Sequence, residues 1–300
     1  MEMLNVSHVS KQFGEKKVLS DLSFSVPAGS VFGFVGQNGA GKTTTMKMIL
    51  GLIAADRGEI YVNGEKVTYG QNKTNRYVGY LPDVPEFYSY MTPREYLNFC
   101  GEITGMETNK NKSRTTELLA LVGLEHEKRH IKGFSRGMKQ RLGIAQALMN
   151  QPKLLICDEP TSALDPVGRK EILDILVSSK EQTTVLFSTH ILSDVERICN
   201  AIAFIKDGKI ALSGNLEQIK NMHQAAGFEI EFEDSSDADK LLFVFPDGKK
   251  RRERNIAFDD VNEQKMMDVL GVVVNQKLAF TKIERLEPTL ESLFLEVVSK

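Results

Sequence analysis

The sequence predicts an α/β protein with a parallel sheet at its centre and a smaller α+β unit at its C-terminal end. Apolar strands alternate with helical segments between residues 31 and 205, a pattern typical of a parallel sheet covered by helices. A glycine-rich turn follows the first of these strands and opens a helix, and a new strand pattern begins after about residue 216. A large and a small domain therefore account for the 300 residues.

Composition excludes several classes of protein. The 38 Lys and Arg against 40 Asp and Glu leave a formal net charge of −2, so no global field attracts nucleic acid, and we expect no nucleic-acid partner. The three cysteines stand in apolar segments, without metal-ligand or disulfide spacing, which suits a reducing cytoplasm. No leader pattern and no apolar run of about 20 residues is present, so we expect a cytoplasmic chain that does not itself cross a membrane.

The first residues indicate an antiparallel sheet. Apolar and polar residues alternate over 4–9 and again over 22–26, and residues 27–29 form a Pro-Ala-Gly turn before an apolar strand over 31–35. The dipeptides Asn63-Gly64 and Asp207-Gly208 are strong hairpin signals. The elements expected beyond residue 35 are helices over 42–52, 167–178 and 192–199 and strands over 154–157, 185–188 and 201–205.

A helical insertion is expected over about residues 84–150. Thr92, with proline next and Glu95 at the third helical position, is a capping box that starts a helix there. In the C-terminal part, the pattern predicts a strand over 228–232, a strand ending at Phe245, a turn over 246–248 and a helix from Thr289. The basic run over 249–252 is interpreted as a solvated hairpin tip, with a patch for anionic lipid or a partner as the alternative.

Residues 36–44, Gly-Gln-Asn-Gly-Ala-Gly-Lys-Thr-Thr, have the sequence and context of a phosphate-binding loop between a strand and a helix. Backbone N–H groups of such a loop converge on phosphates, Lys42 reaches the β- and γ-phosphates, and the Thr43 hydroxyl binds Mg²⁺. A glycine-rich turn that matches by chance is the alternative. The motif predicts ATP or GTP binding with Mg²⁺, and its candidate ligands are Gly36, Asn38, Gly39, Gly41, Lys42, Thr43 and Thr44.

Two carboxylates and a histidine follow neighbouring strands. Asp158 and Glu159 end the strand over 154–157, where Asp158 could hold Mg²⁺ and Glu159 could polarise the attacking water. His190 follows the next parallel strand and is expected near the same edge, within reach of a γ-phosphate. Helix capping is the alternative role for the carboxylates, and a cap or surface position is the alternative for the histidine.

At this point the sequence resembles a known family, the ATP-binding cassette (ABC) ATPases. Residues 133–142, Gly-Phe-Ser-Arg-Gly-Met-Lys-Gln-Arg-Leu, resemble the family signature, which is normally Leu-Ser-Gly-Gly-Gln followed by a basic run. Residues 161–166 resemble the D-loop, and residues 188–190 resemble the switch histidine. The resemblance covers roughly residues 4–214 and implies a P-loop NTPase fold with ATP hydrolysis by Lys42, Glu159 and His190.

The resemblance implies further ligand residues. Phe13 would stack on adenine, with core burial as the alternative. Ser135 and Gly137 would contact the γ-phosphate held by a second ABC ATPase subunit, because the helix that begins at Ser135 presents unpaired N–H groups. Asp165 of the D-loop belongs to the same set of nucleotide-binding residues.

Two positions depart from the family pattern. Arg136 replaces a glycine of the signature and adds positive charge near phosphate, and we expect activity to persist. Asp83 stands where the Q-loop glutamine is usual. Its carboxylate could bind Mg²⁺ or water, so the expected metal ligands are Thr43, Asp83 and Asp158.

Several segments look like the ATPases of bacterial exporters of antibiotics, peptides, lipids or sodium, including 79–82, the stretch beginning at Met91, and 286–294. We therefore expect residues 1–216 to form an ABC nucleotide-binding domain and 217–300 a small accessory domain. Partners would be a second ATPase subunit and polytopic membrane permease subunits, on the inner face of the membrane. Alternatives are a soluble ABC ATPase that acts on a ribosome or another macromolecule, and a regulatory module that binds ATP without hydrolysing it.

Overall fold

The computed structural model describes residues 2–71, 73–222, 227–259, 263–286, 290–291 and 293–294. The chain divides into two compact units, Met1–Leu216 and Glu217–Lys300. The first unit is α/β and contains every predicted site residue, and the second is a small α+β unit.

An antiparallel sheet opens the first unit. Its strands run in the order β2-β1-β4-β5, with bounds Lys16–Pro27, Glu2–Phe13, Arg57–Val62 and Glu65–Lys66. The hairpin between β4 and β5 turns at Asn63 and Gly64, whose φ values are 50° and 78°. Two consecutive positive φ values are what a type I′ hairpin turn requires, so this predicted turn is confirmed.

A six-stranded sheet in the order β10-β9-β3-β8-β7-β6 forms the centre of the unit. Its strands are β3 (Val31–Val35), β6 (Val78–Leu81), β7 (Leu154–Asp158), β8 (Thr184–Thr189), β9 (Ala201–Lys206) and β10 (Lys209–Asn215). All neighbours pair in parallel except β9 and β10, which form an antiparallel hairpin. The carboxyl ends of β3, β7 and β8 meet at one edge, because Val35 pairs with Thr189 and Asp158 with Ser188.

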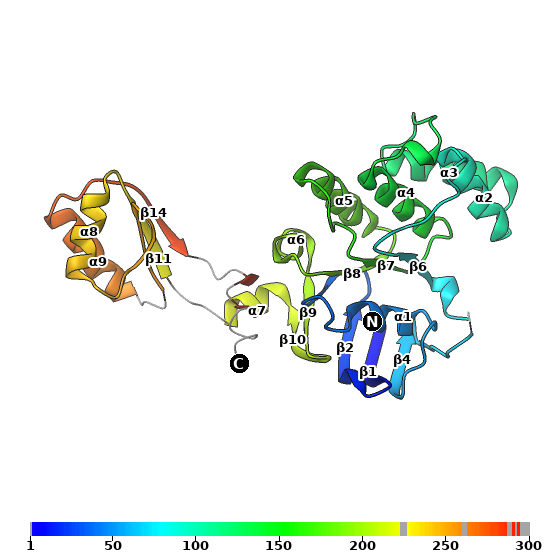
Figure 1. Ribbon diagram of the computed structural model, residues 1–300, viewed down its shortest axis with the longest axis horizontal. Helices are drawn as coiled ribbons and strands as arrows, with labels where there is room; N and C mark the ends of the chain where they lie inside the picture. Colours follow the sequence, from blue (N-terminus) through cyan, green and yellow to red (C-terminus); the bar gives the residue numbers. More distant parts are fainter. Residues whose placement is uncertain are drawn as a thin grey trace. The chain divides into compact units, whose positions relative to one another are not determined.

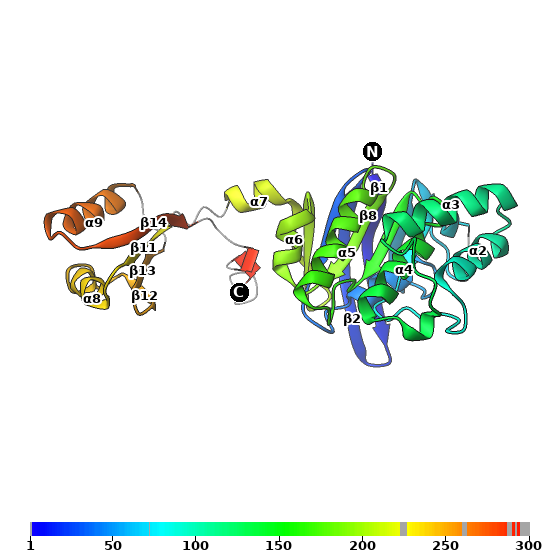
Figure 2. The ribbon, with the colours of Figure 1, turned by 90° about the horizontal axis from the view of Figure 1, so that it is seen from above.

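Helices cover both faces of this sheet (Figures 1 and 2). Helix α1 (Lys42–Ile49) contacts both β4 and β7 and so lies between the two sheets, whereas α4 (Arg136–Leu148), α5 (Pro166–Ser179) and α6 (Leu192–Ile198) pack against the opposite face. The helical insertion adds α2 (Pro93–Ile103) and α3 (Thr108–Leu121). Helix α2 begins with the predicted capping box, in which Glu95 N donates to Thr92 Oγ1 and Glu95 Oε2 accepts from Thr92 N.

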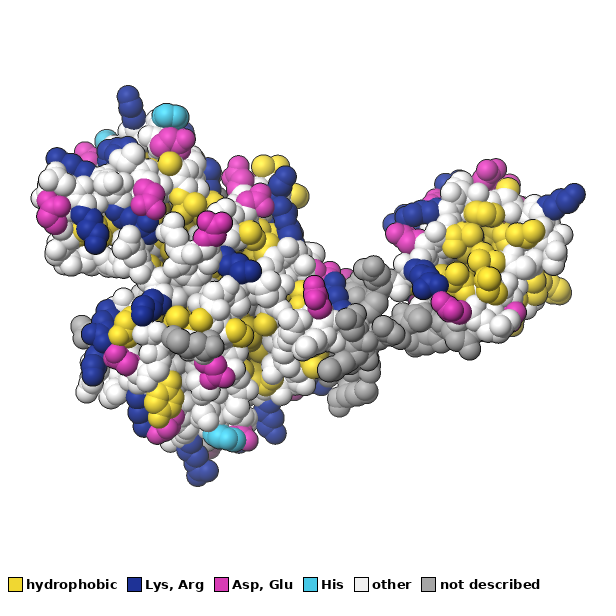
Figure 3. Space-filling model, turned by 180° about the vertical axis from the view of Figure 1, so that it is seen from behind, with side chains coloured by type: hydrophobic (Ala, Val, Ile, Leu, Met, Phe, Trp, Pro, Cys, Tyr) yellow, Lys and Arg dark blue, Asp and Glu magenta, His cyan; other side chains and the backbone are white. Residues whose placement is uncertain are grey.

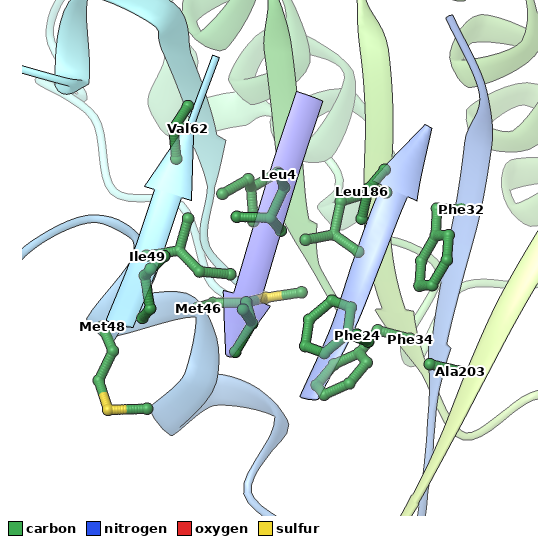
Figure 4. Packing of buried hydrophobic residues seen from close by; sticks show 14 of the residues in the cluster. Leu4, Phe24, Phe32, Phe34, Met46, Met48, Ile49, Val62, Leu186 and Ala203 are labelled. Carbon is green, nitrogen blue, oxygen red and sulfur yellow. The ribbon is translucent and has the colours of Figure 1, made fainter. Parts of the chain in front are cut away.

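A cluster of buried hydrophobic side chains packs between the two sheets (Figure 4). Phe24 of β2 stacks on Phe32 and Phe34 of β3, with ring centroids 5.9 and 5.0 Å apart. Met46 and Ile49 of α1 are fully buried in the same cluster. Because α1 and β3 are packed on both sides, the loop that joins them starts and ends on rigid elements.

The second unit is a four-stranded antiparallel sheet with the chain order βαββαβ, as in ferredoxin-like folds. Helix α7 (Leu216–Met222) follows β10 in the chain. The elements of the fold are β11 (Gly227–Phe232), α8 (Ser235–Val244), β12 (Lys249–Arg252), β13 (Asn255–Phe258), α9 (Glu263–Asn275) and β14 (Phe280–Leu286). Phe228, Ile230 and Phe258 of the sheet pack with Leu241 and Val269 of the helices. This unit therefore has a hydrophobic core of its own.

Two local predictions in this unit were wrong. The segment ending at Phe245 is helix α8 rather than a strand, because Asp234 caps it by accepting from Ser236 N, and Ala238 and Leu241, three residues apart, both face the core. The basic run over 249–252 is the edge strand β12 rather than a hairpin tip. Its Lys249 pairs with Asp259 at 3.0 Å. Charged side chains are typical of edge strands, where they discourage pairing with another sheet.

The surface of the second unit is partly apolar. Figure 3 shows apolar side chains gathered on one face of this unit, and its exposed apolar residues include Phe243, Met267 and Val274. No helix among the described residues is both long and apolar enough to cross a bilayer. The helix predicted from Thr289 lies largely outside the described residues.

Candidate active site

The turn between β3 and α1 has a shape that only glycine permits at two positions. Gly41 has a φ of 107°, and a Cβ added there would lie 2.5 Å from Leu19 Cδ2. A Cβ on Gly36 would lie 2.6 Å from the backbone oxygen of Ile205. These close approaches explain why the loop is glycine-rich, and they fix its backbone against β2 and β9.

Lys42 is the first residue of α1 and its side chain is only 6% exposed. Its Nζ donates to the backbone oxygens of Gly36 at 2.6 Å and Gln37 at 3.2 Å. The same Nζ lies 3.0 Å from Glu159 Oε1. A buried ammonium needs such oxygen partners, and here they hold the positive charge beside the glycine-rich loop.

Asp158 ends β7 and is buried, with 3% of the residue exposed. Its Oδ2 accepts from Thr43 Oγ1 at 2.8 Å, and its Oδ1 accepts from Ser188 Oγ at 2.6 Å. The loop, β7 and β8 are thereby joined through one carboxylate. The two hydroxyl donors also satisfy the hydrogen-bonding capacity of a buried carboxylate that has little contact with water.

Glu159 has a strained backbone and a paired side chain. Its φ is 48°, a value that is uncommon outside glycine and that costs on the order of 1 kcal/mol or more. Its N–H donates to the backbone oxygen and to Oγ of Ser188. Its Oε2 lies 2.9 Å from Nδ1 of His190, and its Oε1 pairs with Lys42 as described above. Through the contact with Lys42, the carboxylate lies beside the glycine-rich loop.

These residues line one cavity of about 620 Å³, within the range usual for small-molecule sites. Phe13 also lines it and is 48% exposed, so the alternative of core burial for Phe13 is wrong. The full lining is Phe13, Lys16, Val18, Asn38, Gly39, Gly41, Lys42, Thr43, Thr44, Asp83, Asp158, Glu159, Ser162 and His190. Eleven of these fourteen residues were singled out from the sequence.

The two departures from the family motifs contact each other. Arg136 Nη2 lies 3.4 Å from Asp83 Oδ1, and Gln140 Nε2 donates to the backbone oxygen of Asp83 at 2.6 Å. Both charged side chains are about half exposed, so the ion pair itself adds little stability. The ion pair does, however, connect Asp83 in the cavity wall to the first turn of α4.

Gly36 of the loop does not line this cavity, and neither do three predicted ligands outside the loop. Ser135 caps α4, since its Oγ accepts from Met138 N at 3.2 Å. Gly137 is in the first turn of the same helix. Asp165 caps α5, where its Oδ1 accepts from Gly168 N at 2.8 Å. Within one chain, these residues are structural caps and first-turn positions.

Comparison with known proteins decides the family. A family model described as "ABC transporter" matches residues 19–162. An uncharacterised ABC transporter ATP-binding protein of Bacillus subtilis (strain 168), YxlF, is 36% identical, over 99% of both chains. The chain belongs to the ABC transporter family, as an ATP-binding subunit.

Other relatives of this ABC subunit are named for their cargo. The bacitracin transport ATP-binding protein BcrA of Bacillus licheniformis is 34% identical, over 99% of this chain and 97% of its own length. The lantibiotic transport ATP-binding protein SrtF of Streptococcus pyogenes is 37% identical, over 77% of this chain and 99% of its own. A solved ATP-binding subunit of an ABC transporter superposes with a TM-score of 0.66 at 33% identity, over 73% of this chain and 92% of that one. The predicted ABC ATPase fold is thus confirmed.

The cavity of the ABC subunit has the chemistry that Mg·ATP needs. Glu159 Oε1 is buried and forms an ion pair with the buried Lys42 amine at 3.0 Å, and both residues line the cavity. Among the described residues, no group of three or more His, Cys, Asp or Glu side chains could hold a metal. Mg²⁺ is commonly bound by one or two protein oxygens together with nucleotide phosphates, and Thr43 and Asp158 fit that pattern.

Sequence reasoning missed four residues of the ABC site. Lys16, Val18 and Ser162 line the cavity, and Ser188 supports both Asp158 and Glu159. Lys16 pairs with Phe13 across the β1–β2 hairpin, so a basic residue just after that turn was an available signal. Ser188 is the next-to-last residue of β8 and pairs in register with Asp158, which only the strand pairing reveals.

Proposed function

We propose that this chain hydrolyses ATP and thereby powers export through separate membrane-spanning subunits. The observation that carries the proposal is the convergence of Lys42, Thr43, Asp158, Glu159 and His190 on one cavity. Phosphate binding, metal binding and water activation each need one of these groups.

The residues have distinct tasks in the proposed reaction. Lys42 binds the β- and γ-phosphates, and Thr43 and Asp158 hold Mg²⁺. When bound, Mg²⁺ neutralises the charge that develops on the phosphate oxygens. The Glu159 carboxylate accepts a hydrogen bond from the attacking water and so orients it. His190 fixes the position of that carboxylate through its contact with Oε2.

A second copy or a related subunit would complete the site. The N-terminus of α4 carries unpaired N–H groups and positive dipole character, which suit an anion. Ser135 and Gly137 at this terminus do not line the cavity of their own chain. We therefore assign them, with Asp165, to the triphosphate of the partner subunit.

The proposed cargo is a peptide antibiotic, since bacitracin and lantibiotic transport proteins resemble this chain over most of its length. The test is affinity purification of the tagged chain from detergent-solubilised cells, with ATPase activity measured on the product. Recovery of a polytopic membrane protein with ATPase activity supports the proposal. Recovery with ribosomes, or ATP binding without hydrolysis, would contradict it.

A further inference from the structure

Two neighbouring loops carry the groups proposed to activate water. One follows β7 and includes Glu159, and the other follows β8 and includes His190. At the cavity they meet through the contact between Glu159 Oε2 and His190 Nδ1. Both loops are irregular, so their relative position needs support from elsewhere.

A buried carboxylate at the start of α6 supplies a second connection. Asp194 is 3% exposed, and its Oδ2 accepts from Oγ1 of the fully buried Thr161 at 2.7 Å. Its Oδ1 accepts from Arg169 Nη2 at 2.6 Å. Thr161 lies two residues after Glu159, and Asp194 lies four residues after His190, so this connection joins the loop of Glu159 to the helix that directly follows the loop of His190.

The carboxylate also closes the D-loop. Thr161 and Arg169 stand at the two ends of the segment that contains Ser162, which lines the cavity, and Asp165, which caps α5. One side chain therefore holds both ends of the segment through its two oxygens. A buried charge of this kind persists only when its partners are in place, and fully paired buried networks are rigid.

We propose that Asp194 is a positioning residue that fixes the loop of Glu159 and the D-loop relative to His190. The hydrogen bonds of its two oxygens go to Thr161 and Arg169, neither of which lines the cavity, so its effect on the site passes through these two residues. We call the two bonds of Asp194, to Thr161 and to Arg169, the clamp. The effect of the clamp on turnover rests on the proposed function, whereas the clamp itself does not. A residue that served folding alone would alter stability without a selective effect on these loops or on the chemical step.

A pair of substitutions separates these roles. Thr161→Val keeps the shape of the side chain but removes the hydroxyl that donates to Asp194, and Thr161→Ser keeps the hydroxyl. Ser179→Ala is the matched control, because Ser179 Oγ makes a comparable buried bond of 2.8 Å, to Ile175 O in α5, outside the cavity lining. Asp194→Asn keeps the shape of the side chain but loses the charge that pairs with Arg169. If Thr161→Val does not fold, Asp194→Asn takes its place in both measurements.

Two measurements test the proposal. Hydrogen exchange without nucleotide should become at least about tenfold faster at the loop amides of Ser162 and Ile191 in Thr161→Val, and remain at the parent rate in Thr161→Ser and Ser179→Ala. In steady-state kinetics, kcat of Thr161→Val should fall about tenfold or more while KM for ATP stays within about twofold, because misplacement of reacting groups slows chemistry more than binding.

The outcomes distinguish the clamp from the proposed function. Unchanged exchange in these loops, or a loss of the same size in Thr161→Ser, would overturn the clamp. Equal changes in Ser179→Ala would overturn it as well. If the parent chain does not hydrolyse ATP but the exchange result holds, the clamp stands and the proposed function fails.

Discussion

Substitution of Glu159 by glutamine is the sharpest single test of the proposed chemistry. The change preserves the size of the side chain and removes its negative charge. That charge lies 2.9 Å from His190 Nδ1 and 3.0 Å from Lys42 Nζ. Without it, the side chain can still form hydrogen bonds, but it no longer attracts a proton of the attacking water.

The magnitude follows from these contacts. A charge-assisted hydrogen bond is worth about 1.5–3 kcal/mol, and a positioned base contributes roughly 10²- to 10⁴-fold. We therefore expect turnover to slow by about 100-fold or more, which corresponds to about 2.7 kcal/mol of barrier. ATP affinity should be no lower than that of the parent, because the Glu159 carboxylate competes with the triphosphate for Lys42 and its neutralisation leaves Lys42 free.

The assay combines ATP hydrolysis with size-exclusion chromatography in the presence of Mg·ATP. ATP-bound dimers of Glu159→Gln should accumulate, because closure is possible but hydrolysis is slow. Glu171→Gln on α5 is the matched control, since Glu171 is half exposed and does not line the cavity. A monomeric Glu159→Gln protein that hydrolyses ATP at the parent rate would refute the reasoning.

Three further predictions concern the rest of the site. Phe13→Ala should weaken ATP binding about 5- to 150-fold through loss of base stacking, and calorimetry should show no change for the exposed control Phe243→Ala; equal effects would contradict stacking. Asp83→Ala should reduce partner-stimulated hydrolysis more than basal hydrolysis, because Asp83 joins the cavity to α4, and equal losses in a reconstituted ATPase assay would count against this link. Chelation of Mg²⁺ should stop hydrolysis, and Thr43→Val and Asp158→Asn should each raise the Mg²⁺ concentration needed for half-maximal rate; an unshifted titration curve would exclude these two ligands.

The sequence predicted the parts of the fold whose signals are local. The turn at Asn63 and Gly64 and the capping box at Thr92 need only adjacent residues, and the structure confirms both. The segment ending at Phe245 was misassigned because a short apolar run fits a strand as well as a buried helix. Its capping residue Asp234 and the spacing of Ala238 and Leu241 decide for a helix.

In the candidate site, too, local motifs could be predicted from the sequence, whereas contacts between distant residues could not. The residues of the loop over 36–44 follow from one motif, whereas the role of Ser188 depends on the pairing of β7 with β8. The contact of Asp83 with Arg136 joins residues 53 positions apart, and that of Thr161 with Asp194 joins residues 33 positions apart. A single sequence carries no signal for such pairs, because either residue alone is compatible with a surface position.

The most direct test of the central claim is a mixing experiment, because the claim is that two subunits share each ATP site. On this claim, Lys42→Ala would remove phosphate binding in its own cavity, and Ser135→Arg would place a bulky side chain at the α4 terminus assigned to the partner's site. Each variant should be inactive alone. A mixture should recover part of the activity, since one site of a mixed dimer combines an intact Lys42 with an intact Ser135. Mixed dimers that form, as shown by cross-linking, yet hydrolyse no more ATP than the single variants would contradict the account.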